Sequence, residues 1–86
     1  MRQDVWIGRV IERKLANGQM PVLPPHAVYG RKSEGAFCTA CDVLITPGET
    51  EIEAIAEDGT SRIYHVRCHE LTRLVRERLF AAVNHT

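Results

Sequence analysis

The sequence predicts a small α+β fold in which a helix near each end of the chain flanks an antiparallel β-hairpin. Residues 4–17 and 67–83 carry apolar residues at helical spacing and predict the two helices. Between them, two short stretches of strand type are joined by Asp58-Gly59, a strong hairpin turn signal. The chain has 86 residues and forms one domain at most. A core this small often needs metals or disulfides to reach adequate stability.

The N-terminal segment, residues 1–18, is expected to be helical over residues 4–17. Asp4 is a candidate N-cap, and Asn17-Gly18 supplies the left-handed residue that commonly follows a helix. An apolar stripe recurs every four residues and consists of Ile7, Ile11 and Leu15. This stripe gives the helix a face to pack against the rest of the chain.

Residues 19–36 are predicted to form a connector that contains proline. Its first part excludes a helix and favours an extended chain because it carries Pro21, Pro24 and Pro25. Residues 30–35 are polar and predict a turn that leads into the last segment, residues 37–86.

Three stretches of the last segment predict short strands. Residues 43–45 form an apolar run that ends at Thr46-Pro47-Gly48. Residues 51–56 alternate as a strand does, and residues 62–64 follow the Asp58-Gly59 turn as the returning strand.

The segment 67–83 is the strongest predicted helix. Its apolar stripe consists of Leu71, Leu74, Val75, Leu79 and Val83. The opposite side carries Arg73, Arg76 and Glu77, and Arg73 and Glu77 are four residues apart, which favours an ion pair.

All three cysteines fall in a pattern typical of a metal site. Cys38 and Cys41 form a C-x2-C, His65 and Cys68 form an H-x2-C, and 23 residues separate the two pairs. Three thiolates and one imidazole are the soft ligand set of a closed tetrahedral zinc site. An odd cysteine count also excludes a complete disulfide framework. We therefore expect one Zn2+ held by these four residues.

His69 is the alternative fourth ligand because it adjoins Cys68. We favour His65, since two ligands three residues apart across the start of a helix converge on one ion better than adjacent residues do. His65 is then expected at the end of a strand, and Cys68 in the first turn of the following helix, where the positive end of the helix dipole favours a thiolate.

The ligand pairs and their surroundings resemble known zinc fingers. The stretch Cys38-Thr39-Ala40-Cys41-Asp42-Val43-Leu44-Ile45-Thr46-Pro47-Gly48-Glu49, followed by Tyr64-His65-Val66-Arg67-Cys68, resembles the first zinc site of LIM domains. No cysteine follows Cys68, so the second LIM zinc site is missing and a long helix takes its place. The ligand order is also similar to that of the nick-sensing fingers of poly(ADP-ribose) polymerases.

With its Lys14-Leu15 … Gly18 … Pro21 lead-in, the whole pattern most resembles small uncharacterised bacterial proteins that carry one such finger. These resemblances imply a treble-clef-type zinc finger over about residues 37–70. They specify a metal and leave the function open.

Charge and motifs restrict the function classes. The formal net charge is zero, and a bound zinc with three thiolates would make it about −1. A non-specific nucleic-acid coat usually needs a strong positive excess. No metalloprotease, phosphate-loop or nucleophile-elbow motif is present, and Glu70 is expected to be a solvated carboxylate, so we expect no enzymatic activity. No secretory leader or bilayer-spanning stretch is visible, which favours a cytoplasmic protein.

Three functions are compatible with this sequence. The first is an adaptor or regulatory module that binds a protein partner, with Trp6 and Tyr29 as candidate contacts, although packing of Trp6 into the core is the favoured interpretation. The second is a nucleic-acid-binding finger that uses the basic residues of its helices, Arg9, Arg13, Arg73 and Arg76. The third is a thiol and zinc redox sensor, in which oxidation of Cys38 and Cys41 releases the metal.

Overall fold

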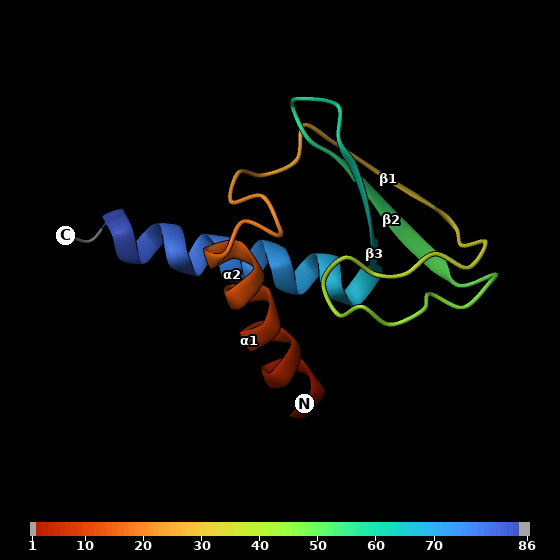
Figure 1. The fold of residues 1–86 in the computed structure, drawn as a ribbon, viewed down its shortest axis with the longest axis horizontal. Coiled ribbons are helices and arrows are strands. Elements are labelled where there is room, and N and C mark those ends of the chain that lie inside the picture. The colour runs from red at the N-terminus through yellow and green to blue at the C-terminus, as the bar shows by residue number, and fades with distance from the viewer. Residues whose placement is uncertain (1, 85–86) are drawn as a thin grey trace.

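The computed structural model describes residues 2–84 and the side chains of residues 4–81. The elements follow in the order α1 (Arg2–Ala16), β1 (Ala27–Lys32), β2 (Thr50–Ile55), β3 (Ser61–His65) and α2 (Val66–Asn84). The two helices cross beside a three-stranded sheet (Figure 1). The predicted α+β class, with helices flanking an antiparallel hairpin sheet, is confirmed.

The sheet is antiparallel with the strand order β1-β2-β3. The predicted hairpin is its β2–β3 half, in which Glu51 lies opposite His65 and Ile52 lies opposite Tyr64. Gly59 has φ +90°, a left-handed conformation that glycine adopts without strain, so the Asp58-Gly59 signal marks the turn correctly. The hairpin therefore brings the two ends of the 23-residue spacer together.

Strand β1 is not predicted from the sequence. Residues 30–32 belong to this strand and pair with β2, where Arg31 lies opposite Glu51, so the turn predicted for residues 30–35 is wrong for its first half. Five of the six β1 residues are exposed, which removes the alternation by which a half-buried strand is recognised. Backbone pairing and an ion pair hold this edge strand, since Arg31 Nε donates to Glu51 Oε2 at 2.7 Å.

The predicted strand over residues 43–45 is also wrong. These residues lie in the loop between β1 and β2 and make only one isolated β-bridge, between Phe37 and Leu44. Ile45 is fully buried, whereas Val43 and Leu44 are exposed. The apolar run therefore anchors the loop through one residue and does not form a strand.

Helix α1 begins at Arg2, so Asp4 lies in its first turn and is not the N-cap. The Asp4 carboxylate instead forms an ion pair with Arg67 of α2. The C-terminal prediction is accurate: the helix ends at Ala16, and Gly18 has φ +84°.

The core lies where α1, α2 and the β-hairpin meet. The α1 stripe is confirmed, with Ile11 and Leu15 buried and Ile7 partly buried. Further buried residues come from the connector, the loop between β1 and β2, the β2–β3 hairpin and α2, and include Met20, Ile45, Ala54, Tyr64 and Val75. A short chain thus forms one shared core and not two separate ones.

The α2 stripe is buried only in part. Val75 is buried and Leu71 packs against the core, but Leu74 and Leu79 are exposed, while the side chain of Val83 lies outside the described residues. For Leu79 the reason is visible in Figure 1, where the second half of α2 extends beyond both α1 and the sheet. Within residues 2–84, no helix combines the length and apolar character needed to cross a membrane.

Candidate metal centre

The first cysteine pair lies on a tight turn, residues 38–43, which we call the cysteine turn. The Asp42 N–H donates to the Cys38 carbonyl at 2.9 Å, and the Cys38 N–H donates to the Val43 carbonyl at 3.0 Å. Asp42 has φ +64°, a left-handed conformation that aspartate tolerates better than most residues. The Thr39 N–H donates to the Ile63 carbonyl of β3 at 2.8 Å, which fixes the turn beside the hairpin.

The second pair spans the junction of β3 and α2. His65 is the last residue of β3 and Cys68 lies in the first turn of α2, as the sequence predicts. The Thr72 hydroxyl donates to the Cys68 carbonyl at 2.8 Å, and Thr72 is fully buried. The positive end of the α2 dipole lies at this junction and favours a thiolate there.

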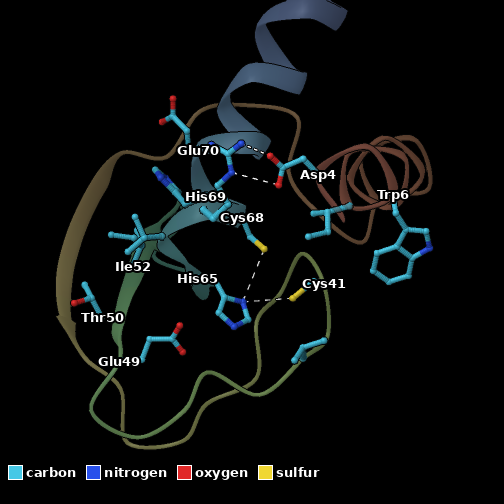
Figure 2. A pocket seen from close by; sticks show the side chains of 14 residues that line it. Asp4, Trp6, Cys41, Glu49, Thr50, Ile52, His65, Cys68, His69 and Glu70 are labelled. Carbon is cyan, nitrogen blue, oxygen red and sulfur yellow. Dashed lines mark hydrogen bonds and ion pairs between the residues drawn. The ribbon is translucent and has the colours of Figure 1, made fainter. Parts of the chain in front are cut away.

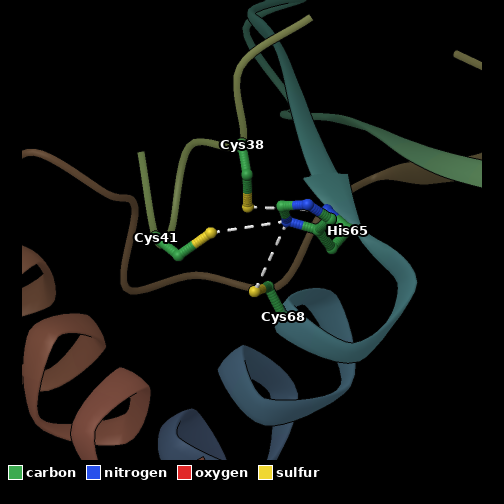
Figure 3. Close-up of side chains that lie close together, drawn as sticks. All are labelled: Cys38, Cys41, His65 and Cys68. Atoms are coloured by element: carbon green, nitrogen blue, oxygen red, sulfur yellow. Dashed lines mark hydrogen bonds between the residues drawn. The ribbon is translucent and has the colours of Figure 1, made fainter. Parts of the chain in front are cut away.

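The four side chains converge on one point. Their ligand atoms all lie within 4.8 Å of one another. His65 Nδ1 is 3.4 Å from Cys41 Sγ and 3.8 Å from Cys68 Sγ, and Figure 3 shows the three sulfurs around the imidazole. In a regular tetrahedral zinc site the sulfur and nitrogen corners are about 3.6 Å apart, given the usual bond lengths. The cluster therefore has the size and the donor set to hold a metal ion.

One side of the cluster is closed by protein and the other borders a pocket. Cys38, Cys41 and Cys68 are buried, while His65 is half-buried. A pocket of about 900 Å3 lies against Cys41, His65 and Cys68, with Trp6 at its edge (Figure 2). An ion could enter the site from this pocket.

The three cysteine thiols differ in pKa. A hydrogen bond from the Cys68 thiol, reinforced by backbone N–H groups, lowers the pKa of Cys38 to about 4. Burial raises the pKa of Cys41, and the interaction with the Cys38 thiolate, followed by burial, raises the pKa of Cys68. The lowered pKa of Cys38 favours its thiolate, the form in which a cysteine binds a cation.

His69, the alternative ligand, lies apart from the cluster. Its ring packs edge-on against Tyr64, with ring centres 5.7 Å apart, and its Nε2 is buried without a hydrogen-bond partner among the described residues. Burial, and secondarily the charge of Arg76, lowers its pKa. His69 packs beside the site, and the cluster is completed by His65.

Lys14 contacts the cysteine turn, and this contact is not predicted from the sequence. Its ammonium group donates to the Thr39 carbonyl at 2.8 Å and to Asp42 Oδ2 at 2.8 Å, and its side chain is 11% exposed. A usable signal exists: Lys14 lies seven residues after Ile7 and three after Ile11, on the apolar face of α1. A lysine at such a position has to find acceptors inside the fold.

The basic residues predicted to contact nucleic acid are in different environments. Arg9 and Arg13 are exposed on α1, whereas Arg73 pairs with Glu70 at 2.6 Å and with Glu77 at 2.8 Å. Arg76 is partly buried, and its Nε donates to the Pro21 carbonyl at 3.2 Å. The predicted Arg73–Glu77 pair is present, and the carboxylates of Glu70 and Glu77 together offset the positive charge of Arg73 that a phosphate would meet.

Trp6 is 58% exposed and Tyr29 is 56% exposed. Packing of Trp6 into the core is therefore wrong: α1 turns this side chain outward, beside the pocket at the metal centre. Both aromatic side chains are accessible to a partner.

Comparisons with protein-family models, with curated proteins and with solved structures found no match to this chain. The assignment of the site consequently depends on the four side chains and their geometry.

Proposed function

We propose that this chain is a small zinc-binding protein whose single Zn2+ is held by Cys38, Cys41, His65 and Cys68 and has a structural role. The observation that carries the proposal is the convergence of four soft donors within 4.8 Å. Thiolate and imidazole donors in a tetrahedral arrangement favour zinc, whereas magnesium and calcium prefer oxygen. Zinc would cross-link α2, β3 and the cysteine turn.

A structural role is supported by the number of protein ligands. Catalytic zinc keeps one position open for water, whereas here four side chains each offer one donor atom, which is enough to fill a tetrahedral shell. A turn that carries two cysteines, a hairpin and a helix that carries the last ligand make up a treble-clef-type finger. The order of elements from the cysteine turn through β2 and β3 to α2 supports that class.

Cobalt substitution tests the ligand set. We expect one Co2+ per chain and the intense visible absorption of tetrahedral cobalt bound to thiolates, displaced by one equivalent of zinc. Weak absorption typical of octahedral cobalt, or a stoichiometry other than one, would contradict the Cys3His assignment.

Acid is expected to release the metal, because protons compete with zinc for the thiolates. The fold lowers the pKa of Cys38 from 9.0 to about 4. The Cys38 thiolate therefore stabilises the fold at high pH, and this stabilisation is lost as the pH falls from 9.0 towards about 4. Bound zinc would lower the pKa of all three thiols, including those of Cys41 and Cys68, which the fold alone raises. Following zinc release with a chromogenic chelator from pH 8 to pH 3 tests this, and zinc that stays bound at pH 3 would argue against thiolate ligation.

We further propose that the protein is an adaptor that binds a partner protein through an apolar groove along α2. The α2 groove has a volume of about 1000 Å3 and is lined mainly by apolar residues, among them Val22, Pro24, Val28, Leu79 and Phe80. Val22 and Phe80 are more than 60% exposed. Such a groove is suited to an apolar helix or strand of another protein.

Arg76 also lines the α2 groove, and no carboxylate pairs with it among the residues that the structure describes. The partner segment that fits best is therefore apolar and carries an acidic side chain opposite Arg76.

Affinity capture with the zinc-loaded protein tests the groove. We expect the wild-type chain to capture a partner protein that Phe80→Glu no longer captures. The control Val5→Glu adds the same charge at an exposed position of α1 and should capture the partner as the wild type does. Equal capture by Phe80→Glu would contradict a role for the α2 groove.

A further inference from the structure

Among the described α1 side chains, residues 4–16, only that of Lys14 is hydrogen-bonded to the cysteine turn. Its ammonium group donates to the Thr39 carbonyl and to Asp42 Oδ2, both at 2.8 Å. The side chain is 11% exposed, whereas that of Asp42 is 73% exposed. The lysine therefore reaches the turn from inside the fold, and the aspartate closes the contact from outside.

The two acceptors lie where they control the turn. Thr39 lies between the two cysteines, and Asp42 directly follows the second one. The Asp42 N–H also donates to the Cys38 carbonyl, so a displacement of Asp42 would move the backbone that carries both sulfurs. Asp42 also has a left-handed φ of +64°, so the turn changes direction at the residue that Lys14 contacts.

The other ion pairs of α1 have a different role. Asp4 pairs with Arg67, and Glu12 pairs with Arg78, so both pairs join α1 to α2. The Arg78–Glu12 pair is exposed and the Arg67–Asp4 pair is partly exposed, and an ion pair in contact with solvent contributes little. They dock the helix, while Lys14 contacts the loop that carries half of the ligands.

We propose that Lys14 is a positioning residue of the metal centre: it holds the cysteine turn so that Cys38 and Cys41 face His65 and Cys68. This inference rests on the proposed zinc site. Groups that orient metal ligands typically contribute a factor of about 10 to 100 in metal affinity. The metal centre thus extends to a residue on α1, 24 positions before the first ligand in the sequence.

The test compares Lys14→Met, which keeps the aliphatic stem and removes the donors, with Lys14→Arg and with Glu12→Gln. Zinc affinity is measured by competition with a chelator, and the fold of each zinc-saturated protein is checked by circular dichroism. We expect Lys14→Met to fold with zinc but to bind it about 10 to 100 times more weakly. Lys14→Arg keeps a positive donor and should lose less zinc affinity than Lys14→Met. Glu12→Gln removes the exposed ion pair with Arg78 and should keep a zinc affinity close to that of the wild type.

The cobalt spectrum separates positioning from a general loss of stability. Leu15→Ala removes a buried neighbour on the same helix and should lower stability while leaving the absorption of bound Co2+ unchanged. Lys14→Met should shift or weaken that absorption, because the two turn sulfurs are less well placed. If Lys14→Met does not fold even with zinc, Asp42→Asn provides the test, since it removes the ion pair and tolerates the left-handed backbone. Its spectrum should change in the same direction by a smaller amount.

The inference is overturned if the wild type binds one zinc while Lys14→Met, or Asp42→Asn in its place, keeps wild-type affinity and an unchanged cobalt spectrum. In that case the proposed zinc site still stands. A wild-type chain that binds neither metal would overturn the zinc site itself, and this inference with it.

Discussion

Replacing Cys41 with serine is expected to unfold the domain. The substitution removes one of four donors, and a serine hydroxyl does not ionise at neutral pH. In comparable zinc-finger peptides the binding free energy of the metal is on the order of 10 kcal/mol and is largely folding free energy. A domain of this size has a total stability of similar magnitude, so loss of the metal removes most of it. Circular dichroism, amide chemical-shift dispersion and zinc stoichiometry measure the effect.

The control for this substitution is Val43→Ser, which introduces the same residue two positions further on. Val43 is 56% exposed and contributes only its backbone carbonyl to the cysteine turn, so zinc content and fold should remain. A Cys41→Ser chain that shows a native circular dichroism spectrum without metal would contradict the structural role of zinc.

Replacing Ile11 with alanine is expected to cost about 2–5 kcal/mol of unfolding free energy, the range found for large buried aliphatic residues. Ile11 is fully buried where α1 crosses α2, so the substitution leaves a cavity in the shared core. Urea denaturation at a fixed concentration of free zinc measures this cost without a change in metal loading.

Val5→Ala is the matched control, because Val5 lies on the same helix and is 61% exposed. Its cost should stay well below 1 kcal/mol, as for most surface substitutions. Equal and small effects at both positions would mean that α1 does not pack on the rest of the domain in solution.

Local sequence signals predict the parts of this fold that they specify directly. The four candidate ligands are recognisable because a metal site needs fixed residue types at fixed short spacing, and the structure places Cys38, Cys41, His65 and Cys68 together. The β2–β3 hairpin is recognisable because Asp58-Gly59 favours one turn geometry. Both helices are recognisable from their apolar periodicity.

The features that the sequence does not reveal depend on contacts between distant residues. Strand β1 is an exposed edge strand, so its pairing with β2 leaves no mark in its own hydrophobic pattern. The run 43–45 is apolar because Ile45 anchors a loop in the core, and periodicity cannot separate that from a short buried strand. The hydrogen bonds of Lys14 go to Thr39 and Asp42, which follow it by 25 and 28 positions in the sequence.

The central claim is that one zinc ion bound to the Cys3His cluster holds this fold together. Native mass spectrometry of the purified protein, combined with circular dichroism during chelation, tests it most directly. We predict one zinc per chain, loss of the folded spectrum as the metal is removed and recovery when zinc is returned. A chain that carries no metal and keeps an unchanged fold in the presence of chelator would contradict the claim.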